Sequence, residues 1–482
     1  MEKKTKILAT VGPASDSVEI LEGLIKAGVN VFRLNFSHGS HEYHSQTLKN
    51  IKEAEKKVGR RVGVLQDLCG PKIRVGKLKS DFELKQNDIL EFHKEQIEGE
   101  QIGAAHYKLS INQPQILPLL KVDEFIYLYD GNIRTKVLEI SESKVVAKVM
   151  NFGKLSSNKG VNFPNTKINI DVVTEKDKKD LLWGVANGVD FMAISFVQRK
   201  EDVLYAKELV KNAGGNVQII AKIEKFDAVE NIDDILKASD GLMVARGDLG
   251  IEVPYYKVPS IQKSIIKKAN AASKPIITAT QMLLSMTEKE TATRAEISDV
   301  ANAVLDGTDA VMLSEESAVG KNPVNVVETM SNTIKEAEKI YPYNKFKDFS
   351  YFDETDVISN STVRLADNLD VRAIISLTGS GKSAKKLARY RIKSDIFAVC
   401  HDERIARTLT IAWGIEPKLV IEKSTLNGML ADTFTKALKD SWVNHESSYI
   451  ITAGYPAGVE GSTNFIRIVK SQEIDYLASL EP

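Results

Sequence analysis

The chain has 482 residues, of which 43% are hydrophobic and 27% charged, a composition typical of a globular protein with about three domains. Lys plus Arg and Asp plus Glu both number 65, so no net charge favours nucleic acid or a membrane surface as a partner. We find neither the apolar core of a signal peptide nor a membrane-spanning apolar run. Only two cysteines occur, Cys69 and Cys400, which favours a reducing compartment, and we expect a cytoplasmic protein.

Two stretches, residues 1–70 and 171–345, alternate short apolar runs with segments of helical period. The runs read TKILAT, VNVFRLNF, RVGVLQD, VDFMAISF, VQIIAKIE, DGLMVARGD, KPIITAT and TDAVMLSE. Eight strands that alternate with helices predict a parallel (β/α)8 barrel. Active sites of such barrels lie where the carboxyl ends of the strands meet.

The alternation is interrupted between residues 71 and 170. This segment loses the helical period, carries strand-like runs such as KVVAKVM, and contains the hairpin signal Asp130-Gly131. We expect an all-β domain, a β-barrel lid, inserted after the third strand. Past residue 345, strands and helices alternate again, so residues 346–482 are predicted to form an α/β domain with an open, mainly parallel sheet.

Polar side chains gather at one end of the predicted barrel strands. They are Arg33, Asn35, Asp67, Ser195, Lys222, Glu224, Asp248, Thr280 and Glu315. Random surface charge would not choose the same end repeatedly, so we expect these groups to converge at the mouth of the barrel. Lys222 and Glu224 stand two residues apart, and strand parity directs both to the same side.

Two carboxylates in this set suit a divalent cation. Glu224 and Asp248 close consecutive strands, and Mg²⁺ commonly takes one or two carboxylates together with substrate oxygens. Lys222, Arg33 and Arg74 would add the positive charge that phosphoryl transfer requires. Backbone N–H groups of ARGDLG could hold a substrate carboxylate. The residues therefore predict a cationic pocket with a metal, Mg²⁺ or Mn²⁺.

Seven longer stretches follow one another in a recognisable order. They read TKILATVGPAS, VFRLNFSHGSHEYH, QDLCGPKIR, IIAKIE, GLMVARGDLGIEVP, ATQMLLSM and TRAEISDVANAVLDGTDAVMLSEESAVGKNP. Together they resemble the pyruvate kinase family over nearly all of residues 1–330. The resemblance implies phosphoryl transfer between phosphoenolpyruvate and ADP, giving pyruvate and ATP, in the last step of glycolysis. It also implies a divalent metal, a C-terminal regulatory domain, and a homotetramer in which GIEVPYYKVP packs between subunits.

The resemblance implies roles for individual residues. Glu224 and Asp248 would bind the metal, and Lys222 would stabilise the phosphoryl group in transfer. Substrate binding would involve Arg33, Ser195, Lys222, Ala245, Arg246, Gly247, Asp248 and Thr280, and nucleotide binding would involve Asn35, His38, Arg74 and Lys159. Thr280 would lie beside the enolate carbon that receives a proton, with Ser298 as a relay. A relayed water is an equal alternative, because a lone hydroxyl is a poor acid.

One stretch departs from the family pattern. Members that need K⁺ carry Thr-Lys-Gly-Pro-Glu after the aspartate that matches Asp67, whereas this chain reads LCGPK at residues 68–72. We hypothesise that the Lys72 ammonium replaces K⁺, so that K⁺ is not required; the alternative is a surface lysine in a hinge. The monovalent-cation region comprises Asn35, Ser37, Asp67, Leu68 and Lys72. Glu315 stands where many members have Gly, and no role follows from it.

The C-terminal domain contains a loop that resembles a phosphate site. LTGSGKSAKK at residues 377–386 fails as a Walker motif, because Ser376 occupies the position of the first glycine. A Gly/Ser loop between a strand and a helix still suits one phosphate. We therefore expect an activating phosphorylated effector, held by Thr378, Ser380, Lys382 and Ser383 and covered by GYPAGVEGSTN at residues 454–464. A tight turn without a ligand is the alternative.

Two other classes of function stay open. A metal-dependent lyase could also place Glu and Asp on successive strands and use Lys222 for a Schiff base, but it does not explain the inserted lid. A non-catalytic metabolite sensor could keep the fold, yet the metal, phosphate and carboxylate residues are all present. We therefore expect a phosphotransferase that binds phosphoenolpyruvate/pyruvate and ADP/ATP, with no nucleic-acid or membrane partner.

Overall fold

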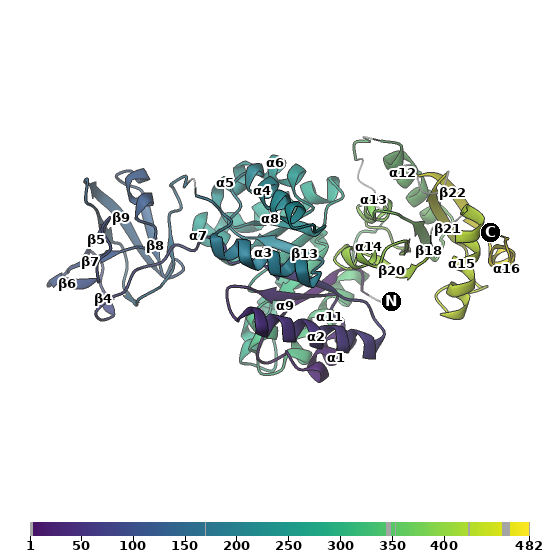
Figure 1. Cartoon of the computed structure of the whole chain (residues 1–482), viewed down its shortest axis with the longest axis horizontal. Helices are drawn as coiled ribbons and strands as arrows, with labels where there is room; N and C mark the ends of the chain where they lie inside the picture. The colour runs from purple at the N-terminus through teal and green to yellow at the C-terminus, as the bar shows by residue number, and fades with distance from the viewer. Residues whose placement is uncertain are drawn as a thin grey trace.

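The computed structural model describes residues 3–168, 170–343, 349–351, 353–422, 425–455 and 463–481. Three parts follow one another along the long axis of the molecule: a β-rich part in blue, a central barrel, and an α/β part in green and yellow (Figure 1). Of the covering segment predicted at residues 454–464, residues 456–462 lie outside the described residues.

The central barrel is closed, eight-stranded and parallel, which confirms the predicted fold. Its strands are β1 (Lys6–Val11), β2 (Val31–Asn35), β3 (Gly63–Asp67), β13 (Phe191–Ile194), β14 (Gln218–Ile223), β15 (Gly241–Ala245), β16 (Ile276–Ala279) and β17 (Ala310–Leu313). Around the barrel they run in the order β1-β17-β16-β15-β14-β13-β3-β2. The strands read as nearly continuous apolar runs because one face fills the barrel interior and the other packs against helices.

Helices that follow the strands cover the outside of the barrel. They are α1 (Val18–Ala27), α2 (His41–Val58), α3 (Glu175–Asn187), α4 (Lys200–Asn212), α6 (Ile232–Ala238), α8 (Val258–Ala271), α9 (Arg294–Asp306) and α11 (Pro323–Lys339). The shorter α5 (Phe226–Glu230), α7 (Arg246–Glu252) and α10 (Glu315–Ala318) begin just past β14, β15 and β17 and so lie at the mouth. Within the described residues, no helix is long and apolar enough to cross a membrane.

The lid, which we define as residues 71–170, contains nine β-strands and one short 3-10 helix, Pro114–Leu119, among its described residues. The strands are β4 (Phe82–Leu84), β5 (Ile89–His93), β6 (Glu100–Gly103), β7 (His106–Ser110), β8 (Phe125–Leu128), β9 (Ile133–Ile140), β10 (Lys144–Val149), β11 (Gly153–Leu155) and β12 (Val161–Asn162). Seven form a sheet in the order β12-β8-β9-β10-β5-β7-β6, and β11 pairs with β4 separately. Residues 73–79 hydrogen-bond to both ends of this sheet: Val161 N donates to the Ile73 carbonyl beside β12, and Lys79 N donates to the Gly99 carbonyl beside β6. These bonds agree with the expected β-barrel, which stays a prediction. The apolar core of the lid is distinct from that of the central barrel.

The C-terminal part has an open sheet in the order β20-β19-β18-β21-β22, parallel except for the β21–β22 pair. Its elements are β18 (Ala373–Leu377), β19 (Asp395–Cys400), β20 (Ile415–Val420), β21 (Tyr449–Gly454), β22 (Thr463–Val469), α12 (Glu354–Asn368), α13 (Lys382–Ala388), α14 (Glu403–Thr408), α15 (Leu426–Lys439) and α16 (Ile474–Ala478). Ile411, between α14 and β20, is buried in the same cluster as Leu8 and Phe191 of the barrel interior. This part therefore packs against the barrel opposite the lid (Figure 1).

Candidate active site

Four charged side chains of alternating sign cross the mouth of the barrel. Arg33 on β2 donates through Nε to Asp67 Oδ2 at the end of β3, over 2.7 Å. Asp67 Oδ1 lies 3.2 Å from Lys222 Nζ on β14, and this ammonium lies 2.9 Å from Glu224 Oε1. Each charge thus has an opposite neighbour, which is how buried charges are tolerated in a protein.

A hydroxyl fixes the ammonium in the middle of this row. Lys222 Nζ donates to Ser195 Oγ over 2.7 Å, and Ser195 Oγ donates to the Leu68 carbonyl over 2.7 Å. Ser195 directly follows β13, the strand that lies between β3 and β14 in the barrel. Four successive strands therefore position the side chains, and the Lys222 head group has little freedom to move.

The electrostatics keep Asp67 and Lys222 ionised. Burial tends to raise the pKa of Asp67, but the charges of Lys222 and Arg33 outweigh it and hold that pKa below its ordinary value. Burial tends to lower the pKa of Lys222, but Asp67 and Glu224 raise it above its ordinary value. Lys222 is consequently an ammonium ion at neutral pH. A Schiff-base lysine must present a neutral amine, so this environment does not favour the lyase alternative.

Glu224 and Asp248 fit a divalent cation. Burial raises the pKa of Glu224, and the negative charge of Asp248 raises it further, in opposition to Lys222. Asp248 lies in the first turn of α7 and lines the same cavity as Glu224. A divalent cation would relieve the repulsion between these carboxylates. Among the described residues, no group of three or more His, Cys, Asp or Glu could hold a metal, so oxygens of substrate and water would complete the coordination.

The structure brings most of the predicted residues to one cavity at the mouth. Those that line it are Arg33, Asn35, Ser37, His38, Asp67, Lys72, Ser195, Lys222, Glu224, Ala245, Asp248 and Thr280. They come from the ends of strands far apart in sequence, as expected for the carboxyl face of a parallel barrel. The roles of these residues stay predictions.

Arg246 does not line this cavity, although its neighbours Ala245 and Asp248 do. Its Nη1 donates to Asp299 Oδ1 on α9 over 2.8 Å, and its Nη2 donates to the Thr280 carbonyl over 2.7 Å. The guanidinium therefore anchors the start of α7 to neighbouring elements. Gly247 N donates to Thr280 Oγ1 over 2.8 Å, so the hydroxyl of Thr280 lies against the same turn. Thr280 also adopts a left-handed conformation, with φ of 69°, which is unusual for a β-branched residue and is found mainly at functional sites.

Ser298, the predicted relay residue, lies apart from this cavity. It is an exposed residue of α9, where its carbonyl and hydroxyl oxygens both accept hydrogen bonds from Asn302 Nδ2. In the described part of the chain, no hydrogen bond joins it to Thr280. The proton relay from Ser298 therefore gains no support from the geometry.

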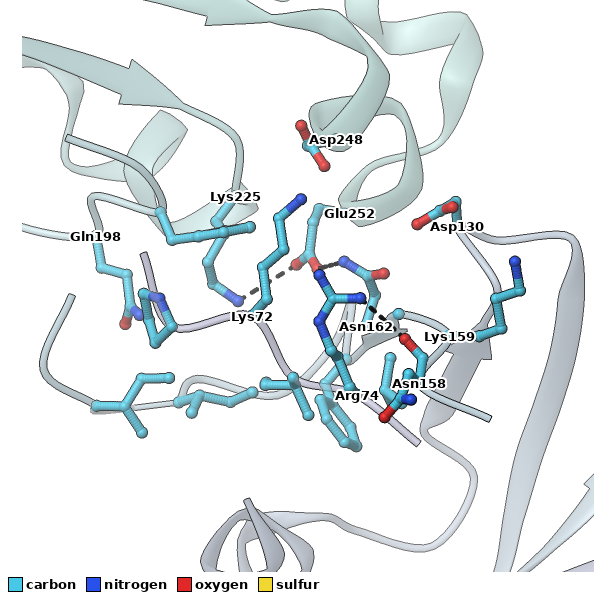
Figure 2. A pocket seen from close by; sticks show the side chains of 18 of the residues that line it. Lys72, Arg74, Asp130, Asn158, Lys159, Asn162, Gln198, Lys225, Asp248 and Glu252 are labelled. Carbon is cyan, nitrogen blue, oxygen red and sulfur yellow. Dashed lines mark hydrogen bonds and ion pairs between the residues drawn. The ribbon is translucent and has the colours of Figure 1, made fainter. Parts of the chain in front are cut away.

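A second cavity of about 400 Å³ lies between the barrel and the lid. Arg74 and Lys159, predicted for the nucleotide side, line it together with Lys72, Phe196 and Asp248, and the last three line the first cavity as well. Lys72 extends toward Asp248 at the junction of the two cavities, whereas Arg74 and Lys159 lie on the lid side (Figure 2). The two cavities are therefore contiguous, with Asn35 and His38 in one and the lid cations in the other.

The predicted monovalent-cation region surrounds this junction. Lys72 is exposed and lines both cavities, while Leu68 is buried and presents only its carbonyl, to Ser195. Asn35 Oδ1 accepts the backbone N–H of Ser37 over 3.2 Å. With Leu68 in place of a threonine, position 68 offers no hydroxyl to a monovalent cation, although Ser37 lines the same cavity.

The predicted effector loop is closed by hydrogen bonds between its own residues. Thr378 Oγ1 accepts the Gly381 N–H over 3.0 Å, and Ser383 Oγ lies 3.2 Å from Ser376 Oγ in the interior. Lys382 Nζ donates to Asp353 Oδ2 over 3.3 Å, and Ser380 is exposed. The structure is thus compatible with the tight-turn alternative as well as with an effector site.

Sequence reasoning missed Glu316 and Thr10. Glu316 is buried and accepts the N–H groups of Leu283 and Ser314 over 3.2 and 2.7 Å, so it ties two loops at the mouth together, whereas the neighbouring Glu315 is exposed. Thr10 Oγ1 accepts from Arg33 Nη1 over 3.0 Å. Thr10 ends the first apolar run, so the strand-end rule that selected Arg33 could have found it.

Comparisons with known proteins agree with this geometry. Residues 2–327 match the family model described as pyruvate kinase, barrel domain, and residues 356–469 match the one described as pyruvate kinase, alpha/beta domain. A pyruvate kinase of Geobacillus stearothermophilus is 44% identical over 477 residues, covering 97% of this chain and 80% of that protein. One of Staphylococcus aureus (strain MRSA252) is 41% identical over 473 residues, with the same coverage. A crystal structure of a pyruvate kinase from Cryptosporidium parvum has a TM-score of 0.90 at 34% identity and covers 97% of this chain and 96% of that one.

Proposed function

The chain belongs to the pyruvate kinase family of phosphotransferases, and we propose that it transfers the phosphoryl group of phosphoenolpyruvate to ADP with the help of a divalent cation. One observation above all supports the proposal: the row of Arg33, Asp67, Lys222 and Glu224 ends beside Asp248 in a single cavity. Cations suited to a phosphate thus lie next to carboxylates suited to a metal.

The charged row would act on the phosphoryl group. Asp67 and Ser195 hold the Lys222 ammonium in place before any substrate binds, so little reorganisation is needed when charge spreads over the oxygens of the group in transfer. Arg33 would contact the same phosphate from the neighbouring strand. Glu224 and Asp248 would hold Mg²⁺ or Mn²⁺, which supplies electrostatic stabilisation to oxygens of the substrate.

Thr280, across the cavity from the charged row, would take part in delivering the proton that the enolate carbon receives. Thr280 lies against the first turn of α7 through its hydrogen bond with Gly247 and lines the cavity. Its hydroxyl donates to the Ala279 carbonyl over 2.7 Å, so a proton passed to the enolate carbon would come from a water that Thr280 orients, or from Thr280 after this bond breaks.

Four further properties belong to the proposal. K⁺ is not required, because Lys72 supplies a permanent cation at the junction of the two cavities. A phosphorylated effector binds at residues 378–383, and four chains associate through the exposed Tyr255 and Tyr256. The free Cys69 and Cys400 agree with a cytoplasmic location.

A coupled assay for pyruvate formed from phosphoenolpyruvate and ADP tests the proposal. We expect pyruvate and ATP in equal amounts, and only when Mg²⁺ or Mn²⁺ is present. Absence of metal-dependent product from a folded protein would overturn it. Trapping of a covalent adduct at Lys222 by borohydride and a keto acid would favour the lyase instead.

A further inference from the structure

We infer that Glu252 is a positioning residue that joins the lid to α7, the helix that carries Asp248. Glu252 Oε1 accepts a hydrogen bond from Asn162 Nδ2 over 3.0 Å, and its Oε2 lies 3.4 Å from Lys225 Nζ. Figure 2 shows the carboxylate between these two donors, below Asp248. The structural part of the inference stands alone, while its effect on turnover rests on the proposed function.

The carboxylate depends on both donors because it is buried. The Glu252 side chain is 4% exposed and that of Lys225 is 8% exposed. A buried carboxylate oxygen without a donor is strongly disfavoured. Lys225 belongs to the barrel, where it follows β14, but Asn162 belongs to lid strand β12. One of the two oxygens of Glu252 is therefore satisfied by the barrel and the other by the lid.

Helix α7 transmits this contact to the mouth of the barrel. Glu252 follows Asp248 by four residues, which places the two on one face of the helix, one turn apart. At its other end the helix is held by Arg246, through Asp299 and the Thr280 carbonyl. Asp248 thus lies on a short helix whose first residue is held by the barrel and whose last residue is held by both barrel and lid.

A second contact lies beside the first. The lid turn at Gly131 lies against α7, where a Cβ atom at this position would be in ordinary van der Waals contact with Ile251 Cγ2, at 3.4 Å. Gly131 has a φ of 81°, a conformation that side chains disfavour. The turn can therefore pack against the helix, and a change in lid orientation would move both contacts together with the end of α7.

Another contact between lid and barrel provides a matched control. Lys167 Nζ of the lid lies 2.9 Å from Glu230 Oε2 of α5, but the two side chains are 70% and 57% exposed. Exposed ion pairs contribute little to stability, and within the described residues no hydrogen bond or ion pair joins this one to α7. Substitution at Lys167 perturbs the same pair of domains without disturbing the helix that carries Asp248.

Hydrogen exchange of the intact chain without ligands is the test. In Asn162→Ala we expect the α7 amides of residues 250–253 to exchange about tenfold faster, while those of β15 stay as in the wild type. In steady-state kinetics we expect the same variant to raise KM for ADP and lower kcat together, each by about three- to tenfold, because the lid cations and Asp248 lose their common support. Lys167→Gln should leave both measurements unchanged.

Substitutions at Glu252 complete the experiment. Glu252→Ala loses the contact with Lys225 as well as that with Asn162, so its α7 amides should exchange at least as fast as in Asn162→Ala. The double variant should exchange no faster than Glu252→Ala alone. Glu252→Gln, which keeps an acceptor for Asn162, should exchange more slowly than Glu252→Ala. Wild-type exchange of α7 in Asn162→Ala, or equal acceleration in Lys167→Gln, would overturn the inference. Absence of phosphoryl transfer would refute the proposed function alone, because the exchange measurement needs no activity.

Discussion

Lys222 Nζ and Glu224 Oε1 lie 2.9 Å apart, so the two residues that close β14 are ion-paired with each other at the mouth of the barrel. Strand parity predicts that both point to the same side, but not that they touch. A metal and a phosphate that bind here must therefore share two groups that already neutralise one another. The two side chains can be separated experimentally.

Lys222→Met should reduce turnover severely and leave metal binding intact. Loss of a preorganised cation at a charge that develops in the transition state costs about 10²–10³ in kcat. Glu224 and Asp248 stay in place and lose a competing cation, so Mn²⁺ titrated into the ligand-free protein should bind at least as tightly as in the wild type. Loss of Mn²⁺ binding in this variant would show that Lys222 acts by holding the metal site together.

Glu224→Gln should weaken metal binding first, and should reduce turnover mainly through that loss. The amide removes one of two carboxylates that suit the metal but keeps an oxygen that can accept from the Phe196 N–H, which now donates to Glu224 Oε2 over 2.6 Å. We expect the Mn²⁺ dissociation constant to rise about tenfold or more, and kcat to recover in part at high metal concentration. If both variants lost metal binding equally and showed no other defect, the division of labour between Lys222 and Glu224 would be wrong.

We expect that the enzyme needs no K⁺ because of the charge of Lys72, and replacement of K⁺ in the assay tests this. In the wild type, replacement of K⁺ by tetramethylammonium at equal ionic strength should change the rate by less than about twofold, since a fixed ammonium already provides the charge. Lys72→Glu combined with Leu68→Thr should make the rate depend on K⁺. Lys77→Glu is the control for charge reversal, because Lys77 is a lid lysine that is 84% exposed. A strong K⁺ dependence of the wild type would overturn the hypothesis.

The sequence predicts where the site lies, but it does not predict which side chains of the site contact one another. Strand ends are found from hydrophobic period alone, so the convergence of Asp67, Lys222 and Glu224 could be expected. The contact of Asn162 with Glu252 could not, because it joins residues 90 apart that only the packing of lid on barrel brings together. Tertiary packing also decides that Glu316 is buried at the mouth while Glu315, which the strand-end rule selects, is exposed.

Local motif reading also assigns side chains to a ligand without showing which groups they contact. The motif ARGDLG predicts that Arg246 helps to shape the substrate pocket, and this stays a prediction; its guanidinium contacts Asp299 and the Thr280 carbonyl. Only tertiary structure decides which partner a long side chain reaches. Arg246 nevertheless acts on the site indirectly, since it holds the first turn of the helix that bears Asp248.

Asp190 should make stability depend on pH. It is buried beside the boundary between barrel and C-terminal domain, and its Oδ2 accepts the Val64 N–H over 2.8 Å. Its pKa is raised from 3.8 to about 7, chiefly by burial and also by the charges of Glu55 and Glu403, against the opposing effects of the Val64 hydrogen bond and Arg407. The folded state therefore prefers the protonated acid, so the stability that this group contributes is complete below about pH 4 and is lost as pH rises toward 7.

Asp190→Asn isolates this effect, because the amide keeps an oxygen for Val64 and cannot ionise. The variant should gain stability relative to the wild type between pH 5 and pH 8, by about 1–2.5 kcal/mol. This is the part of the effect of the pKa shift that develops between these two pH values, discounted for relaxation around the charge. Urea midpoints of both proteins at the two pH values measure it, since other titrating groups cancel in the difference. Asp123→Asn, at an exposed lid residue paired with Lys136, should show no such trend. A constant difference between Asp190→Asn and the wild type would mean that Asp190 is already ionised in the fold, with Arg407 stabilising its charge across the domain boundary.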